Sequence, residues 1–342
     1  MNTHVSGLSA SVDQVGADSH RLLHLEDLRI SFPASDGIGR VQILHGVAFG
    51  LERGQALALV GESGSGKTMT ARALIGLLPP TARIESGEMV LDGKDLMRLN
   101  RRQWRAVRGG SIGTVFQDAM SGLDPVRTIG SLLMESIRLH TSLSRKAARA
   151  QAIEVLGSVG IPNPVERLKS YPHQLSGGQR QRVMIALAIV TKPPLVIADE
   201  PTTALDATIQ AQILELLRTE LGRSSLIIIT HDLGVAASIA DKTAVMYAGR
   251  IVEYGRTSDV LERPRHPYTV GLLDAAPAFS RERRPLRPIP GTPPRPQDLG
   301  AGCAFAPRCL NVQPDCLPEV PEITHDSGRQ YACLHPIEER PR

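Results

Sequence analysis

The chain has 342 residues, enough for one large domain with an appendage or for two domains. Apolar residues make up 42%, which suffices for a packed core, whereas the 3% of aromatic residues disfavours stacking platforms for single-stranded nucleic acid. The net charge of +4 neither requires nor excludes an acidic partner. No apolar run reaches the ~18 residues of a membrane span, and the opening segment lacks an apolar signal core. We therefore expect a cytosolic protein that meets a membrane only through a partner.

The first part of the chain has strand patterns. Residues 1–20 are small and polar and predict a loose tail. Apolar residues alternate over 24–32, and further strands are expected at 41–51, 56–60 and 88–91, the last ended by an Asp-Gly turn. This part is therefore expected to be rich in β-structure.

A glycine-rich stretch, Gly61–Thr68, matches the spacing G-x-x-x-x-G-K-[ST] between an apolar strand and a helical pattern over 68–78. Its glycines let backbone N–H groups approach an anion, and the following helix points its positive end at that anion. Lys67 offers a charge to the β- and γ-phosphates, and Thr68 offers a hydroxyl to Mg²⁺. A chance glycine-rich turn is the alternative that this context disfavours. The residues expected to bind nucleotide are Gly61, Glu62, Ser63, Gly64, Ser65, Gly66, Lys67 and Thr68.

The second part of the chain alternates strands and helices. Strands are expected at 112–116, 195–198 and 226–229, and helices at 176–190 and 207–221. Continuous apolar strands alternating with helices predict a parallel sheet covered on both faces.

An all-helical insert is expected over 125–171, with its clearest helix at 144–159. Later, 244–246 and 251–254 predict a hairpin turned by Ala248 and Gly249. Beyond about residue 263 prolines recur every few residues, so a helix is expected there only at 268–276. This region is either a small separate module or an extended wrap.

Two further motifs concern phosphate chemistry. The strand at 195–198 delivers Asp199, which could hold Mg²⁺, and Glu200, which could polarise an attacking water. The run Leu175–Gln179 (LSGGQ) forms an open helix N-terminus, which binds phosphate, although a plain N-cap with flexible glycines is the alternative. One chain thus has two phosphate-binding elements and one carboxylate pair. Two chains placed head to tail would combine them, with Ser176, Gly177, Gly178 and Gln179 facing the other chain's nucleotide.

These ordered motifs resemble the ATP-binding subunits of ABC transporters over residues 22 to about 263. The resemblance implies that Phe32 stacks on adenine, with a core phenylalanine as the alternative. It implies that Gln117 contacts Mg²⁺ and the attacking water and senses the membrane partner. It also implies that Ala204–Asp206 crosses a dimer interface, with Asp206 near the nucleotide, and that His231 contacts the γ-phosphate.

The tail resembles the C-terminal region of oligopeptide, dipeptide and nickel permease subunits. The resemblance rests on His266–Leu273, Ile289–Pro294 and Gly302–Cys309. It implies an ATPase that powers import of short peptides, or of nickel, glutathione or another small solute. The rival class is a soluble ABC ATPase acting on nucleic acid or ribosomes. The single motif set and the absence of heptads disfavour that class.

Four cysteines lie in the tail with the spacing C-x5-C-x6-C-x16-C: Cys303, Cys309, Cys316 and Cys333. Such clustering in a cytosolic chain disfavours structural disulfides, and no C-x-x-C pair of a zinc ribbon is present. A metal could stabilise a proline-rich module with little core. The resemblance implies a [4Fe–4S] cluster, while zinc and free thiols remain alternatives. His325 is expected at the surface.

The expected fold is α/β: a P-loop NTPase parallel-sheet core with an antiparallel β subdomain, a helical insert over about 118–184 and a Pro/Cys-rich C-terminal extension. The expected divisions are 1–20, 21–263 and 264–342. The resemblance implies a second ATP-binding subunit, either a paralogue or another copy. It also implies two membrane permease subunits, an extracytoplasmic solute-binding protein, no nucleic acid, and a place on the cytoplasmic face of the bacterial inner membrane.

Overall fold

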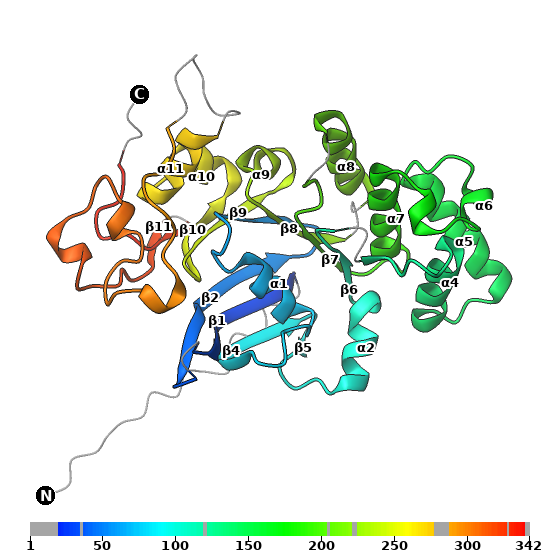
Figure 1. Cartoon of the computed structure of the whole chain (residues 1–342), viewed down its shortest axis with the longest axis horizontal. Coiled ribbons are helices and arrows are strands. Elements are labelled where there is room, and N and C mark those ends of the chain that lie inside the picture. Colours follow the sequence, from blue (N-terminus) through cyan, green and yellow to red (C-terminus); the bar gives the residue numbers. More distant parts are fainter. Residues whose placement is uncertain are drawn as a thin grey trace, which may run out of the picture.

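The computed structural model describes residues 20–34, 37–118, 122–203, 206–220, 224–276, 287–326 and 328–338. These residues form two β-sheets with helices packed around them (Figure 1). The expected N-terminal tail, apart from His20, lies outside the described residues.

The smaller sheet is antiparallel and has the strand order β2-β1-β4-β5. Its strands are β1 (Arg21–Pro33), β2 (Arg40–Glu52), β4 (Arg83–Leu91) and β5 (Lys94–Asp95). The β-rich N-terminal part is therefore confirmed, and its strands run further than the apolar patterns indicated. At the start of β1 the extra residues include the fully buried Leu22 and Leu23, whereas those added to β2 and β4 are half-exposed or exposed and are held by backbone pairing.

The larger sheet has the order β11-β12-β10-β9-β3-β8-β7-β6. Strands β9, β3, β8, β7 and β6 are mutually parallel, as expected, and β10 pairs antiparallel with β9 through the predicted hairpin. Its strands are β3 (Ala56–Val60), β6 (Ile112–Val115), β7 (Leu195–Asp199), β8 (Ser225–Thr230), β9 (Lys242–Tyr247), β10 (Arg250–Arg256), β11 (Thr324–Asp326) and β12 (Arg329–Tyr331).

The parallel strands bury both faces. In β3, Leu57 and Leu59 belong to the core shared with the antiparallel sheet and α1, whereas Ala58 and Val60 belong to the core shared with the helices. Successive side chains of a strand point to opposite faces, so a strand between two cores must be apolar throughout. This explains the continuous apolar runs in the sequence.

The helices α4 to α7 gather at one end of the molecule (Figure 1). Within this group α4 and α7 both pack against α5, which confirms the helical insert. The helices are α1 (Lys67–Leu74), α2 (Arg101–Gly110), α4 (Ile129–His140), α5 (Arg145–Ser158), α6 (Pro164–Arg167), α7 (Gly177–Ile189), α8 (Ala207–Glu220), α9 (Leu233–Ile239), α10 (Thr257–Glu262) and α11 (Pro267–Ala275). No helix in the described ranges combines the length and apolarity that crossing a membrane requires.

One expected helix is shorter than predicted, and the helices α2, α9 and α10 were not predicted. Helix α1 ends at Leu74 rather than at 78, because Gly76 takes a φ of +62°, which leaves the right-handed helix. Helix α2 was not predicted, because Val107 is its only fully buried residue and its apolar signal is weak. A capping box between Asn100 and Gln103 starts it instead.

The C-terminal segment returns to the main sheet. Besides β11 and β12 it contains the 3₁₀ turns η3 (Pro296–Asp298), η4 (Ala306–Arg308) and η5 (Pro314–Cys316). Strand β12 pairs with β10, and the fully buried Glu253 of β10 accepts hydrogen bonds from Arg329 and from the backbone N–H groups of Arg265 and His266. The C-terminal segment is therefore joined to the main sheet through β10.

Candidate nucleotide-binding site

The expected site residues gather at one edge of the main sheet. Because β3, β8, β7 and β6 are adjacent and parallel, their carboxyl ends lie side by side. Such an edge is where ligands bind in open α/β sheets. The residues that follow these strands are Gly61 after β3, His231 after β8, Glu200 after β7 and Gln117 two residues after β6.

The loop from Gly61 to Thr68 needs glycine for two reasons. Gly61 and Gly66 have φ of +150° and +107°, which favour glycine. A Cβ on Gly61 would lie 2.2 Å from the carbonyl oxygen of Met246, and one on Gly66 would lie 2.6 Å from a methyl group of Leu44. The loop is thus pressed against the sheets on its inner side.

Lys67 spans the loop with its side chain. Its buried Nζ donates to the carbonyl oxygens of Gly61 at 2.7 Å and Glu62 at 2.9 Å. Burial lowers the pKa of Lys67, while the carboxylates of Glu200, Asp199 and Glu62 act in the opposite direction. Phosphate oxygens could replace these carbonyls as hydrogen-bond acceptors. Their negative charge would then pair with the positive charge of the ammonium.

A possible magnesium site lies beside this lysine. The Thr68 hydroxyl donates to Oδ1 of Asp199 at 3.4 Å, so the two expected Mg²⁺ ligands are neighbours. Burial raises the pKa of Asp199, and the hydrogen bond from Thr68 opposes that rise. Carboxylate and hydroxyl oxygens are ligands that suit Mg²⁺, and a bound cation would favour the charged carboxylate.

Glu200 is the centre of a second cluster. Its carboxylate accepts hydrogen bonds from Nε2 of Gln117 at 3.0 Å and from the hydroxyl of Thr203 at 2.8 Å. Nδ1 of His231 lies 3.4 Å from its other oxygen. The structure thus brings together three residues expected to be catalytic and adds Thr203, which the sequence reasoning missed.

Ser176 and Gln179 form the start of α7. The Ser176 hydroxyl accepts from the N–H of Gln179 at 3.3 Å, and the Gln179 side chain accepts from the N–H of Ser176 at 3.2 Å. Ser176 and Gly177 are exposed, and Gly178 packs near Ile209. Within the part of the chain that the structure describes, no hydrogen bond joins Ser176–Gln179 to the phosphate loop. The two phosphate-binding elements therefore stay separate in one chain.

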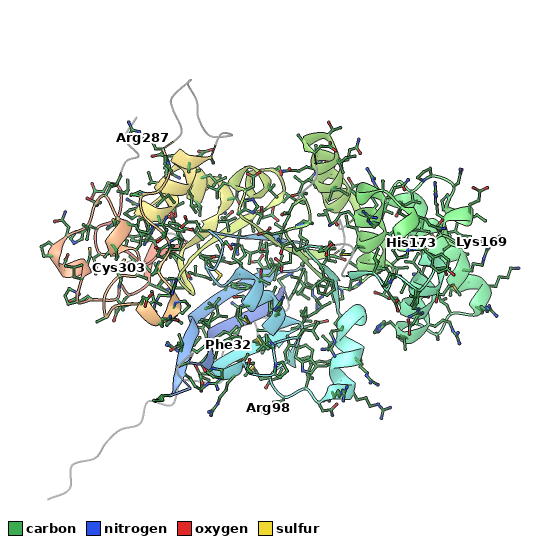
Figure 2. The ribbon with its side chains drawn as sticks, viewed as in Figure 1. Phe32, Arg98, Lys169, His173, Arg287 and Cys303 are labelled. Atoms are coloured by element: carbon green, nitrogen blue, oxygen red, sulfur yellow. The ribbon has the colours of Figure 1, made fainter. Side chains whose placement is uncertain are left out.

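The remaining expected residues have other neighbours. Oδ1 of Asp206 accepts from the N–H groups of Thr208 and Ile209 at the start of α8, while Ala204 and Leu205 lie outside the described residues. Phe32 is half-buried on the antiparallel sheet, where Figure 2 labels it, and packs against the core there.

The four cysteines line one small pocket in the C-terminal segment, together with His266 and His335 (Figure 2 labels Cys303). None of these four cysteines forms a disulfide. The N–H of Cys303 donates to the Cys316 carbonyl at 2.9 Å, and the N–H of Asn311 donates to Sγ of Cys309 at 3.3 Å. Burial raises the pKa of the Cys333 thiol to about 12. The pocket thus gathers four soft ligands from distant positions.

Sulfur spacing tests which metal group suits this pocket. One tetrahedral zinc ion would hold its four sulfurs about 3.8 Å apart, given Zn–S bonds of about 2.3 Å. Among the described residues, ligand atoms of three side chains come within 4.8 Å of one another only at Asp315, Cys316 and His335. No three of the four sulfurs are therefore as close together as one bound zinc ion would hold them. His325 is exposed, as expected.

Two residues that the sequence reasoning missed contact the phosphate loop from the C-terminal segment. Arg308 and Tyr268 both hydrogen-bond to Glu62. Arg308 lies 246 positions from Glu62 in sequence, and no local pattern connects them.

This fold and site define an ATP-binding cassette ATPase. A family model described as ABC transporter matches residues 44–203. The dimeric post-hydrolysis structure of the ATP-binding cassette MJ0796, bound to ADP and Pi, matches with a TM-score of 0.62 and 26% identity over 69% of this chain and 99% of that chain. CbiO1 from Clostridium perfringens, part of an ABC transporter complex, matches with a TM-score of 0.60 and 29% identity over 71% and 92%.

A second family model, the oligopeptide/dipeptide transporter C-terminal region, matches residues 252–316. The dipeptide transport ATP-binding protein DppD of Bacillus subtilis is 48% identical over 86% of this chain and 89% of its own length. The oligopeptide transport ATP-binding protein OppD of Salmonella typhimurium is 44% identical over 97% and 99%. The chain therefore belongs to the ATP-binding subunits of oligopeptide/dipeptide ABC importers and is the ATPase of such a transporter.

Proposed function

We propose that this subunit powers the uptake of short peptides. The observation that supports the proposal is likeness across nearly the whole chain, C-terminal region included, to relatives named for dipeptide and oligopeptide transport. Nickel, glutathione or another small solute are the alternative cargoes. The other subunits of the transporter would contact the solute, so the residues of this chain do not select among these cargoes.

For the chemistry, we assign Lys67 and the loop Gly61–Thr68 to the triphosphate. Mg²⁺ would be held by Thr68 and Asp199 with Gln117 nearby, and it would neutralise charge on the phosphates when bound. Glu200 accepts the proton of the attacking water, and His231 contacts the γ-phosphate. The hydrogen bonds and short distances that join Glu200 to Gln117 and His231 support these roles.

We assign the other half of each site to a facing subunit. The exposed N-terminus of α7 would supply Ser176 and the two glycines to nucleotide on the partner, with Asp206 nearby and Phe32 stacking on adenine in its own chain. The exposure of Ser176 and the dimeric state of the related cassette MJ0796 support this arrangement. The partner is a paralogue or a second copy of this chain.

The assembly we propose contains two ATP-binding subunits, two membrane permease subunits and an extracytoplasmic solute-binding protein. In this assembly the chain lies on the cytoplasmic face of the inner membrane, and no nucleic acid takes part. We also propose the divisions expected from the sequence: a tail at 1–20, an ATPase domain at 21–263 with a helical insert over about 118–184, and a C-terminal module at 264–342.

For the cysteines, we propose that Cys303, Cys309, Cys316 and Cys333 hold a [4Fe–4S] cluster with a structural role. The proposal is supported by their shared pocket, in which no three sulfurs lie as close together as one zinc ion would hold them. Bound there, the cluster would join distant parts of a segment that has little core of its own. Iron and sulfide analysis of anaerobically purified protein tests this, with zinc or metal-free thiols as the contrary results.

Cargo and partners are tested together by purifying the chain with its neighbouring permease and ATPase subunits and reconstituting them in liposomes. We expect ATP-dependent uptake of a labelled dipeptide, and ATP hydrolysis stimulated by peptide-loaded binding protein. Stimulation by nickel or glutathione but not by peptide would replace the cargo proposal. Co-purification with nucleic acid or ribosomes instead of permease would contradict the assembly.

A further inference from the structure

The second residue of the phosphate loop, Glu62, is held by the C-terminal segment. Both of its carboxylate oxygens accept from the Arg308 guanidinium, Oε2 from Nη1 at 2.6 Å and Oε1 from Nη2 at 2.9 Å. The Arg308 side chain is only 4% exposed, against 27% for Glu62. This is a bidentate, charge-assisted pair that is buried on the arginine side and partly exposed on the glutamate side, and such pairs are among the strong side-chain hydrogen bonds.

Arg308 has little freedom to turn away from Glu62. Its Nε donates to the carbonyl of Pro290 at 2.8 Å, and Nη1 also reaches the Tyr247 hydroxyl at 3.3 Å. Its guanidinium lies 5.8 Å from the centre of the Tyr247 ring, which packs against Tyr268 and Phe305. The fork is therefore fixed in the orientation that meets Glu62.

A second contact holds the backbone of the same loop residue. The N–H of Glu62 donates to the Tyr268 hydroxyl at 2.8 Å, and Tyr268 comes from α11. The Glu62 carbonyl in turn accepts from Nζ of Lys67. The position of Glu62, set from outside the loop, thus bears directly on the lysine that faces the triphosphate.

We propose that Arg308 is a positioning residue for ATP hydrolysis: acting through Glu62, it holds the phosphate loop in its binding shape and neutralises a carboxylate that would otherwise repel the triphosphate. Tyr268 assists through the Glu62 backbone. The inference concerns the ATPase and does not depend on which solute is carried. Through Arg308 and Tyr268, the C-terminal segment therefore helps to shape the nucleotide site.

The position of Arg308 in the chain links this device to the cysteine pocket. Arg308 is the last residue of the turn η4, which lies between Cys303 and Cys309. The loop that carries two of the four thiols therefore also carries the guanidinium that holds the phosphate loop.

The test measures kcat and the KM for ATP of the full chain in its transporter complex. We expect Arg308→Ala to raise the KM for ATP and lower kcat/KM by roughly ten- to a hundredfold, since a displaced phosphate loop and an unpaired carboxylate both weaken phosphate binding. Arg308→Lys keeps the charge but loses the fork, so its effect should be smaller. Tyr268→Phe removes one oxygen without disturbing ring packing and should also raise KM.

The decisive arm adds Glu62→Gln to Arg308→Ala. If Arg308 acts through the charge on Glu62, the double variant binds ATP better than Arg308→Ala alone, a non-additive rescue that a mere loss of folding would not produce. Arg265→Ala is the matched control. Arg265 joins the same segment through the Ile337 carbonyl and Asp326, and none of the hydrogen bonds found among the described residues links its side chain to the phosphate loop, so its replacement should leave KM unchanged.

The proposal is overturned if Arg308→Ala lowers kcat with an unchanged KM, which would indicate a smaller folded fraction. It is also overturned if Arg265→Ala raises KM equally, or if the second substitution brings no recovery. Tyr268→Phe and Arg308→Lys keep the proposal testable where Arg308→Ala does not fold.

Discussion

Glu200 combines an uncommon backbone conformation with a crowded carboxylate. Its φ is +46°, a region that costs a residue other than glycine roughly 1–3 kcal/mol. Its N–H donates to the Ile229 carbonyl at 2.9 Å, and its side chain meets Gln117, Thr203 and His231. These contacts hold the carboxylate at the edge of the sheet.

Replacing Glu200 with Gln should abolish turnover while leaving ATP binding intact. The amide keeps the shape but cannot take the proton of the attacking water, so we expect kcat to fall roughly 10²–10⁴-fold. Phosphate release at saturating ATP measures kcat, and a fluorescent ATP analogue measures binding. Glu166→Gln, an exposed acid in α6, is the control and should hydrolyse normally. Normal turnover by Glu200→Gln would refute its assignment as the base.

His45 should make stability depend on pH. Burial, then Arg250 and Arg29, lower its pKa from 6.5 to about 4, and its buried Nε2 has no hydrogen-bond partner among the residues that the structure describes. The unfolded chain therefore binds this proton at a higher pH than the folded chain does. Stability contributed by His45 is present above about pH 6.5 and is lost as the pH falls towards 4.

Unfolding by urea at several pH values measures this effect. We expect the fall in unfolding free energy between about pH 6.5 and about pH 4 to be shallower in His45→Leu than in the natural chain. His325→Gln, which changes an exposed histidine, should keep the natural slope. An unchanged slope in His45→Leu would mean that this histidine does not titrate on unfolding.

Single residues were predictable where a spaced motif named them. Lys67, Thr68, Asp199 and Glu200 were expected, and the structure places them at one edge of the sheet. Arg308 and Tyr268 lie in tail motifs that carry the family resemblance, but nothing in those motifs indicates their partner Glu62, which lies far away in sequence. Only contacts in the folded chain identify such residues.

At the scale of elements, close backbone packing joins β6 to α7. Gly113 in β6 faces the carbonyl of Ala188 in α7, and a Cβ on Gly113 would lie 2.0 Å from that oxygen. Backbone cannot yield as a flexible side chain can. The approach of these two elements therefore depends on the missing side chain.

Gly113→Ala should destabilise the chain by about 1–3 kcal/mol, since α7 must move away from the sheet. Urea unfolding measures the change. Gly157→Ala makes the same chemical substitution on the exposed side of α5, where the nearest heavy atom to the new Cβ would be Pro164 Cγ at 3.9 Å. We expect that control to be neutral or to stabilise by up to about 1 kcal/mol. Equal effects of both substitutions would rule out the packing explanation.

The sequence predicted the bounds of a helix or strand more closely where that element is more deeply buried. The doubly buried strands β3, β7 and β8 were placed within a residue or two, because both faces demand apolar side chains. Helix α2 escaped because its exposed surface is polar. The short strands β11 and β12 escaped because partner backbone, rather than their own sequence, selects the extended conformation.

At the scale of the whole molecule, the two phosphate-binding elements do not meet within one chain. We expect Ser176→Arg to abolish ATP hydrolysis in the assembled pair, because a long cation would block the start of α7 from the facing nucleotide. ATP binding by the variant's own phosphate loop should be unaffected. Hydrolysis and binding assays separate the two effects.

Ser158→Arg puts the same bulk on an exposed serine of α5 and should leave hydrolysis unchanged. Hydrolysis at full rate by Ser176→Arg in a subunit too dilute to pair would refute the composite site. Loss of ATP binding in that variant would show that Ser176 serves its own chain.

The sequence by itself determined the phosphate chemistry, the parallel core and the helical insert. Each depends on local spacing: a loop that must wrap an anion, strands that must be apolar on both faces, and helices with a repeating apolar side. Such constraints act between residues close in the chain, so they leave a readable pattern.

Tertiary structure alone decided how the C-terminal segment is used. Three features join residues far apart in sequence: the pairing of β12 with β10, the common pocket of four thiols, and the ion pair between Arg308 and Glu62. Contacts of this kind form only in the folded chain. In each of them, a residue at many other sequence positions could have supplied the same partner. Local sequence therefore could not specify them.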